Sequence, residues 1–272
     1  MYGGKKVLIT GASAGIGYAL SGELAKRGSE VIITARRKDK LEALAQKIED
    51  AGGKAHIFVE DLSLPESGIK LYNQIKSAGL NVDILINNAG YGRWGELTSY
   101  ERDDYSKMLQ LNVTTLTDLC HLYITDMVAQ GGGGIINVGS MASLSPIPYA
   151  SVYSSSKAYV LMFSEAIRYE YQDKEIKVMA LLPGGTESEF ASVATEKSEK
   201  LTKRNQEREG SAAGGAMQTS LEVAVECLEA FEKNKQYFLC GGRNRFLYNL
   251  TRIMSRQRVL EMTGRMFKKT AG

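Results

Sequence analysis

Seven short apolar segments alternate with longer segments of helical periodicity, and this alternation limits the fold more than any other feature. The apolar segments cover residues 7–10, 31–34, 55–59, 84–86, 135–138, 178–182 and 237–239. Uninterrupted apolar strands separated by helices are typical of a parallel sheet covered on both faces. The pattern predicts a doubly wound α/β fold whose ligand site lies at the carboxyl ends of the strands.

Composition places the chain among ordinary globular proteins. Of its 272 residues, 43% are hydrophobic and 24% charged, which excludes disordered and fibrous chains. No apolar run reaches the length of about 18 residues that a transmembrane helix needs, and the first apolar run is too short for a signal peptide. Three scattered cysteines and two histidines predict buried thiols in a reducing cytoplasm, with neither a disulfide framework nor a metal site.

A glycine-rich turn connects the first predicted strand to the first predicted helix. Gly11, Gly15 and Gly17 stand in the segment TGASAGIG at residues 10–17. Gly11 permits a tight turn, whereas Gly15 and Gly17 let the backbone approach a phosphate. The helix that follows offers free N–H groups and the positive end of its dipole. We therefore predict a dinucleotide site; the alternative is a tight turn without a ligand.

An arginine pair follows the second predicted strand, where NAD-binding proteins of this architecture carry a carboxylate for the ribose 2′-hydroxyl. Arg36 and Arg37 stand there, and a guanidinium suits the 2′-phosphate of NADP. We expect NADP(H) to be preferred over NAD(H). The alternative is a solvated basic turn.

Tyr153 and Lys157 stand four residues apart on a helix predicted over residues 153–171, so their side chains share one face. An ammonium beside a phenol lowers the pKa of the phenol and makes it a usable general acid and base. Ser140 follows the fifth predicted strand, where its hydroxyl can reach a substrate oxygen.

Taken together, these motifs resemble the short-chain dehydrogenase/reductase superfamily, in its shorter single-domain branch that prefers NADP. The resemblance covers roughly residues 5–240. The matching residues are Gly11, Gly15 and Gly17 in the turn, Asp61 and Leu62 after the third strand, Asn87, Asn88, Ala89 and Gly90 at the fourth, Asn112 on a helix, Ser140, Tyr153 and Lys157, and Pro183 with Gly184 after the sixth.

The resemblance implies a Rossmann-like doubly wound seven-stranded parallel sheet in a single domain. It implies reversible hydride transfer between a nicotinamide and a ketone, aldehyde or alcohol, with Tyr153, Lys157, Ser140 and Asn112 as the catalytic set. In this set Asn112 positions a water next to Lys157. The implied cofactor contacts are Gly11, Ser13, Gly15, Ile16, Gly17, Arg36, Arg37, Asp61, Leu62, Asn88, Ala89, Gly90, Tyr153, Lys157, Pro183, Gly184 and Thr186.

Two positions depart from the usual pattern of the family. Ser188 stands where many relatives have threonine and keeps the hydroxyl, whereas Gly139 replaces a frequent second serine. Substrate contacts are expected from Ser140 and Tyr153. An apolar substrate pocket is predicted on loops at the ligand side of the sheet, with candidate residues Tyr91, Trp94, Met141, Ile147, Tyr149 and Phe190.

Two segments stand outside this core pattern. Residues 191–219 are polar and glycine-containing, and we expect a substrate lid there, with a disordered linker as the alternative. The catalytic domain is assigned to residues 1–242. Residues 243–272 carry eight basic residues and one acidic residue, a net charge of +7, so the remaining chain sums to −4.

The basic extension shows apolar residues at helical spacing and is predicted as an amphipathic helix. It resembles the extension of a bacterial subgroup of the superfamily. Three interpretations stay open: packing on its own domain or a sister subunit, which we favour; weak contact with an anionic membrane surface; or a solvated tail. Nucleic-acid binding is not expected, because the body is acidic.

The function predicted from the sequence is an NADP(H)-dependent oxidoreductase. An NADP-sensing regulator without turnover is the alternative, disfavoured because the whole catalytic set is present. A sugar-nucleotide epimerase or dehydratase is disfavoured by chain length and glycine spacing. From the resemblance we expect a homo-oligomer formed through helices near residues 101–129 and 153–171.

Overall fold

The computed structural model describes residues 1–187, 189–190, 194 and 217–271, with the side chains of 269–271 excepted. The predicted lid at 191–219 therefore lies outside the described residues, apart from Ala194 and residues 217–219. Ser188 also lies outside them.

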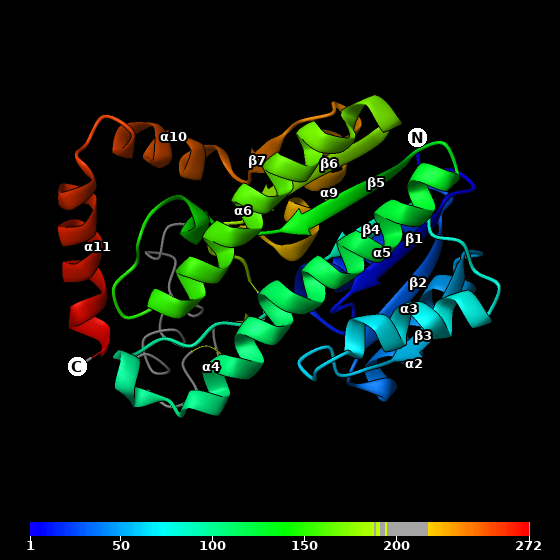
Figure 1. Ribbon diagram of the computed structural model, residues 1–272, viewed down its shortest axis with the longest axis horizontal. Coiled ribbons are helices and arrows are strands. Elements are labelled where there is room, and N and C mark those ends of the chain that lie inside the picture. Colours follow the sequence, from blue (N-terminus) through cyan, green and yellow to red (C-terminus); the bar gives the residue numbers. More distant parts are fainter. Residues whose placement is uncertain (188, 191–193, 195–216, 272) are drawn as a thin grey trace.

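Seven parallel strands form one sheet in the order β3-β2-β1-β4-β5-β6-β7, which confirms the predicted doubly wound fold (Figure 1). Each predicted apolar segment falls on a strand. The strands are β1 (Lys6–Thr10), β2 (Glu30–Ala35), β3 (Lys54–Val59), β4 (Ile84–Asn87), β5 (Gly133–Val138), β6 (Ile176–Leu182) and β7 (Tyr237–Leu239).

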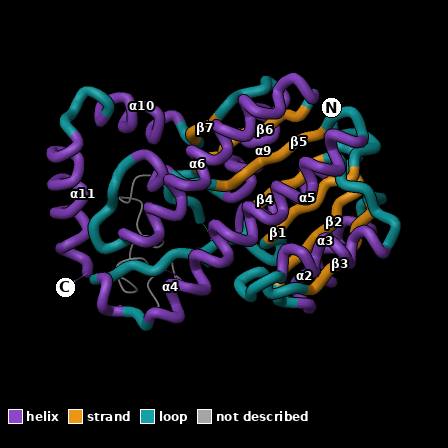
Figure 2. Tube along the Cα trace, in the orientation of Figure 1, coloured by secondary structure: helices purple, strands orange, loops and turns teal. Residues whose placement is uncertain are grey.

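Helices cover both faces of the sheet, as Figure 2 shows. The α-helices are α1 (Gly15–Lys26), α2 (Lys38–Asp50), α3 (Ser67–Ser77), α4 (Arg102–Leu109), α5 (Leu116–Ala129), α6 (Ser151–Tyr171), α9 (Ser220–Glu232), α10 (Gly242–Thr251) and α11 (Arg256–Ala271). Shorter turns of helix are η1 (Leu97–Ser99), η2 (Gln110–Thr115), η3 (Met141–Leu144) and η4 (Gln172–Lys174).

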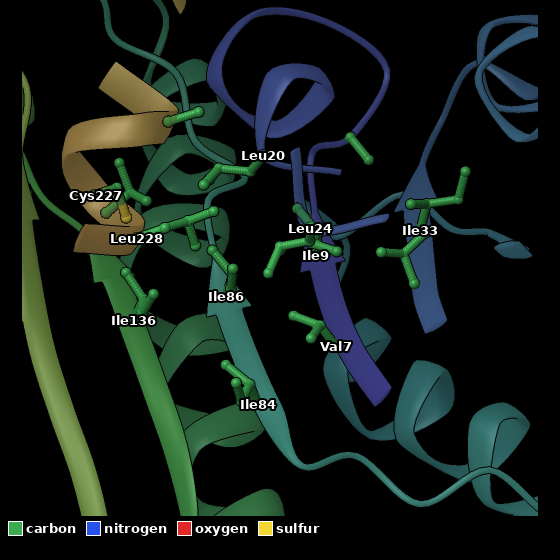
Figure 3. Close-up of a cluster of buried hydrophobic side chains, with 14 of the residues drawn as sticks. Val7, Ile9, Leu20, Leu24, Ile33, Ile84, Ile86, Ile136, Cys227 and Leu228 are labelled. Carbon is green, nitrogen blue, oxygen red and sulfur yellow. The ribbon is translucent and has the colours of Figure 1, made fainter. Parts of the chain in front are cut away.

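The central strands β1, β4, β5 and β6 are largely apolar because both of their faces are buried, whereas the edge strand β3 is only partly covered. Val7 and Ile9 of β1 pack in one cluster with α1 and α9, whereas Leu8 packs in the other with α3 and α5. Figure 3 shows the first cluster, with Leu20 and Leu24 of α1 facing the strands. Burying one such side chain stabilises the fold by about 1.5–3 kcal/mol, so the sheet is a rigid base for the loops at its carboxyl edge.

The helix predicted near residues 101–129 is interrupted by a π-helical turn. The segment η2 joins α4 to α5, and Asn112 lies within it, 1% exposed. Such π turns inside α-helices are frequent at functional sites.

The C-terminal extension forms two helices, α10 and α11, rather than the single helix predicted. A short turn at residues 252–255 separates them. Within the described residues, no helix has both the length and the apolar character needed to cross a membrane.

Candidate active site

The glycine turn lies at the carboxyl end of β1, against the turn that follows β4. Gly11 has φ +68, and a Cβ there would lie 2.9 Å from the Cα of Ala89. A Cβ on Gly17 would collide with the carbonyl oxygen of Gly11. Both positions therefore require glycine, because backbone segments approach each other at this point.

The N-terminus of α1 has the features of a phosphate site. Its N-cap residue, Ala14, forms no side-chain cap hydrogen bond, and the first turn carries no acidic residue. The N–H groups of this turn and the helix dipole are thus available to an anion. Ser13 and Ile16 lie half-buried in the same turn. This cradle fits the pyrophosphate of a nicotinamide dinucleotide.

The turn after β4 is fixed to β1 by Thr10, which the sequence analysis places in the glycine turn without assigning it a role. Its hydroxyl accepts hydrogen bonds from the backbone N–H groups of Asn88 at 3.0 Å and Ala89 at 2.9 Å. The Asn88 amide donates in return to the carbonyl oxygen of Thr10 at 2.8 Å. A buried threonine at the end of a strand, beside a glycine turn, was the available signal.

The arginine pair lies at the carboxyl end of β2, with both side chains exposed. Arg37 donates to the Ser13 hydroxyl at 3.0 Å and pairs with the Glu189 carboxylate at 2.8 Å. The guanidinium thus stands next to the glycine turn, as a residue that contacts the 2′-phosphate must. Glu189 was missed by the sequence analysis, since nothing in the sequence alone brings it to Arg37.

The remaining predicted cofactor residues lie along the same edge of the sheet. The Asp61 carboxylate accepts from the N–H of Ser63 at 3.0 Å, whereas Leu62 is buried in the core beneath it. After β6, the carbonyl oxygen of Pro183 accepts from the N–H of Met141 at 2.9 Å. Thr186 donates to the carbonyl oxygen of Gly184 at 3.3 Å.

Tyr153 is brought to Ser140 by the packing of α6 against η3. Ser140 caps η3 and hydrogen-bonds with Tyr153. The Tyr153 side chain is almost fully buried, with the Phe190 ring centred 5.5 Å from its own. Burial raises the pKa of Tyr153 to about 12, and the hydrogen bond with Ser140 acts in the opposite direction. The phenol therefore holds its proton at neutral pH.

Lys157 lies one turn further along α6 and is also buried. Its Nζ donates to the carbonyl oxygen of Val138 at 2.8 Å, and burial lowers its pKa to about 8. The predicted lowering of the Tyr153 pKa by this ammonium is not found. The reason is that burial disfavours the charged form of both groups, and desolvation outweighs the other influences on the phenol.

Asn112 and Gly90 complete the cluster around Lys157. A Cβ on Gly90 would lie 3.0 Å from Oδ1 of Asn112 and 3.1 Å from Nζ of Lys157. The Asn112 amide donates to the carbonyl oxygen of Tyr91 at 3.0 Å and to the Ser156 hydroxyl at 3.1 Å. Asn112 and Gly90, which come from separate motifs of the sequence, thus lie beside Lys157.

The predicted substrate-pocket residues divide into two groups. Tyr91, Ile147 and Phe190 pack in one apolar cluster with Tyr153. The other three lie apart from that cluster. Met141 packs against β6 and β7, Trp94 stacks edge-on against Phe267 of α11, and Tyr149 lines a groove beside α11.

Comparison with known proteins identifies the family. The model of the short chain dehydrogenase family matches residues 5–199. The chain is 37% identical to 17-beta-hydroxysteroid dehydrogenase type 3 from Homo sapiens over 183 residues, 66% of this chain and 58% of that protein. It spans about three fifths of the length of this relative and of others like it.

A second relative is similar over almost its whole length. The 7beta-hydroxysteroid dehydrogenase of Clostridium sardiniense is 28% identical over 265 residues, 97% of this chain and 96% of that protein. Among solved structures, a short-chain dehydrogenase from Sphingobium yanoikuyae in complex with NADPH has a TM-score of 0.76 and 27% identity, over 91% of this chain and 94% of that one. This chain belongs to the short-chain dehydrogenase family.

Proposed function

We propose that the protein is an NADP(H)-dependent oxidoreductase that interconverts a carbonyl group and an alcohol. The observation that carries the proposal is the convergence of Tyr153, Lys157, Ser140 and Asn112 beside the glycine turn, at the carboxyl edge of the sheet. Chains related to this one include dehydrogenases that act on hydroxysteroids, which supports the same type of reaction.

When bound, the nicotinamide cofactor supplies or accepts the hydride. Tyr153 moves the proton at the substrate oxygen. Its phenol is protonated at neutral pH because its pKa is about 12, which suits donation in the direction of reduction. Ser140 hydrogen-bonds with Tyr153, so its hydroxyl is placed to bind the same substrate oxygen and stabilise the charge that develops there.

Lys157 and Asn112 support proton transfer by Tyr153 from the side of the site away from the substrate. The pKa of Lys157 is about 8, so its amine can take up and release a proton near neutral pH. Asn112 holds the backbone of Tyr91 and the hydroxyl of Ser156, which fixes the wall of the site next to α6. Together they provide a route for replacing the proton that Tyr153 gives up.

The preference for NADP over NAD rests on Arg36 and Arg37. Arg37 pairs with the Glu189 carboxylate and the Ser13 hydroxyl beside the glycine turn. Its guanidinium is therefore placed to bind an anion such as the 2′-phosphate. The relative from Sphingobium yanoikuyae has NADPH in its structure. An acidic residue at the end of β2, which would suit NAD, is absent from the sequence.

The substrate we propose is a bulky, apolar ketone or secondary alcohol. Tyr91, Ile147 and Phe190 surround Tyr153 with apolar surface. Two relatives are named for hydroxysteroids, which are substrates of this type. The free thiols Cys120, Cys227 and Cys240 are all buried, which supports a reducing, cytoplasmic setting.

Replacement of Tyr153 by phenylalanine tests the proposal. We expect turnover of an apolar ketone with NADPH to fall by about a hundredfold or more, because the proton donor is lost. NADPH affinity, measured by fluorescence titration, should stay near that of the wild type. Tyr159→Phe is the matched control, since Tyr159 lies on the same helix, is 38% exposed and contacts Thr117. Normal turnover in Tyr153→Phe would reject the assignment.

A further inference from the structure

The two C-terminal helices present an exposed apolar face. Phe246 and Leu250 of α10 are 63% and 45% exposed, and Ile253 in the turn that follows is 85% exposed. In Figure 1 these helices, orange to red, extend away from the sheet. The apolar side chains exposed along this arm, here called the outer face, are Phe246, Leu247, Leu250, Ile253, Leu260, Met262 and Met266.

The opposite side of α11 is fixed to the loops at the substrate side of the sheet. Thr263 donates to the carbonyl oxygen of Pro146 at 3.5 Å, and a Cβ on Gly264 would lie 3.4 Å from Pro148. The Phe267 ring stacks edge-on against Trp94 with centroids 5.7 Å apart. Because this side of α11 is held in place, the orientation of its exposed side relative to the site is defined.

The start of α10 is held in place as well. The Asn244 amide donates to the carbonyl oxygen of Cys240 at 2.8 Å and covers Gly184, and Arg245 donates to the carbonyl oxygen of Leu239 at 3.0 Å. Tyr248 packs against the end of the sheet. Asn244 and Tyr248 thus face the body, so Phe246 and Leu250 point away from it.

Basic side chains are frequent along the same arm, although Arg245 turns toward the body and Arg265 and Lys268 line the space between α11 and the loops. The exposed ones in residues 243–268 are Arg243, Arg245, Arg252, Arg256, Arg258, Arg265 and Lys268. Glu261 is the single acidic residue in that range. The rest of the chain is net negative, so the positive charge is concentrated on this arm.

We propose that the outer face docks on an anionic lipid surface. Apolar side chains flanked by arginines suit the boundary between headgroups and acyl chains, where apolar burial and attraction to anionic lipid act together. A second copy of the chain fits this face less well. A twofold contact places the same surface on itself, and would therefore bring the arginines of one copy against those of the other.

Docking in this way places the substrate side of the site near the membrane. A groove of about 550 Å³ lies between α11 and the loops, and its lining is mixed: Leu97, Pro148, Tyr149, Ser151 and Gly264 together with the charged residues Glu96, Glu261, Arg265 and Lys268. The groove lies on the side of α11 opposite the outer face, so docking of the arm would hold it about one helix diameter, ~10 Å, from the lipid surface. The substrate class that follows, resting on the proposed function, is an apolar ketone or alcohol dissolved in the bilayer.

The test uses the full chain and vesicles of equal parts phosphatidylcholine and phosphatidylglycerol. We expect co-sedimentation with these vesicles and little with pure phosphatidylcholine. The variant Phe246→Ser/Leu250→Ser/Ile253→Ser should bind about tenfold more weakly or worse, since apolar burial drives such binding. Leu64→Ser/Ile69→Ser/Leu221→Ser is the matched control, because these side chains are 47%, 44% and 50% exposed on the body.

Several outcomes would overturn the docking proposal. The first is equal vesicle binding by the variant and its control. The second is a wild-type protein that does not bind vesicles, combined with an outer-face variant whose mass in light scattering is lower than that of the wild type. That result would assign this face to contact with a second copy of the chain. The thermal midpoint of both variants should match the wild type, which shows that the fold is retained.

Activity separates this inference from the proposed function. The outer-face variant should keep its KM for a water-soluble ketone and show a higher KM for a ketone dissolved in vesicles. An unchanged KM for the dissolved ketone would reject delivery from the bilayer. If neither the wild type nor any variant turns over a ketone while vesicle binding is retained, the oxidoreductase assignment is rejected. The docking proposal is still supported in that case.

Discussion

The guanidinium of Arg37 pairs with the carboxylate of Glu189 at 2.8 Å, beside the glycine turn where the dinucleotide is proposed to bind. Arg37 also donates to Ser13 in the glycine turn. One arginine thus links the turn after β1 to the segment after β6. A 2′-phosphate that binds Arg37 has to replace the carboxylate, so Glu189 acts as an internal competitor for the proposed NADP site.

Removing the charge of Glu189 should therefore strengthen NADPH binding. We expect Glu189→Gln to lower the Kd of NADPH by about two- to fivefold, in keeping with the small free energy of an exposed ion pair. The Kd of NADH should change little, because NADH has no 2′-phosphate. Fluorescence titration with both cofactors measures the two values.

The control for this prediction is Glu187→Gln, which removes an exposed carboxylate two residues earlier. The Glu189→Gln effect should also disappear when Arg37 is alanine, as a double-mutant cycle would show. An equal gain for NADH, or a gain that persists without Arg37, contradicts competition at this arginine.

Lys157 should reduce the stability of the fold at neutral pH. Burial lowers its pKa from 10.5 to about 8. Below pH 8 the lysine is protonated in both the folded and the unfolded chain, so the full cost of burying the charge is subtracted from the free energy of unfolding. Between pH 8 and 10.5 the unfolded chain binds more protons, so stability rises with pH. Replacing Lys157 by methionine removes this dependence.

We expect Lys157→Met to be inactive and, at pH 7, more stable to urea by on the order of 1–3 kcal/mol, after loss of the hydrogen bond to Val138 is subtracted. The advantage should shrink as pH rises from 8 to 10.5. Urea unfolding of both proteins across this range measures it. A constant difference would mean that the lysine is not desolvated as the structure indicates.

The sequence was sufficient for the features that follow from local pattern. All seven strands coincide with segments rich in apolar residues, because helices cover both faces of the sheet, and Gly11 and Gly17 show directly in the spacing of the turn. Glu189 was not found, and Thr10 was placed in the glycine turn without its role, because their partners lie far away in sequence. The pKa of Tyr153 was predicted in the wrong direction, since the spacing to Lys157 does not reveal how deeply both groups are buried.

Two helical features also escaped the sequence pattern. The π turn at Asn112 arises from tertiary contacts, in which the amide binds the backbone of Tyr91 and the hydroxyl of Ser156. The break between α10 and α11 has no proline to mark it, and the periodicity of the apolar residues continues across it. Contacts of α11 with Pro146 and Trp94 account for its separate direction.

Replacing Asn112 should lower kcat and the thermal midpoint more than it changes the affinity for the cofactor. Its amide donates to Tyr91 and Ser156, and its Oδ1 accepts from the N–H of Tyr91 at 3.2 Å. Asn112→Ala removes the partner of the two backbone groups of Tyr91, at a cost of about 1–3 kcal/mol for each group, whereas the Ser156 hydroxyl keeps its bond to the carbonyl oxygen of Tyr153. We expect a lower thermal midpoint and a lower kcat, with the Kd of NADPH nearly unchanged.

Asn112→Asp is the informative comparison, because it keeps the acceptor for the Tyr91 N–H and removes the two donors. Its kcat should fall between those of the wild type and Asn112→Ala. If both variants turn over like the wild type while the thermal midpoint falls, Asn112 is structural only, and its place in the catalytic set is wrong.

The family resemblance predicts a homo-oligomer formed through α5 and α6, and α6 offers a surface for it. Met162 and Tyr169 lie two helical turns apart on one side of α6 and are 72% and 77% exposed. A twofold contact places this surface of one subunit against the same surface of the other. Met162→Glu/Tyr169→Glu would then bring like charges together, and we expect the mass in light scattering to fall to that of one chain.

Ile69→Glu/Leu221→Glu adds the same charge at exposed sites away from α6 and should leave the mass unchanged. The outer face of α10 and α11 provides a second comparison, since its serine variant should keep the oligomer intact while it loses vesicle binding. An unchanged mass for the α6 variant, or a lower mass for the outer-face variant, would move the subunit contact away from α6. In the second case the subunits associate through the C-terminal helices, because those helices carry the other large exposed apolar surface of the described chain.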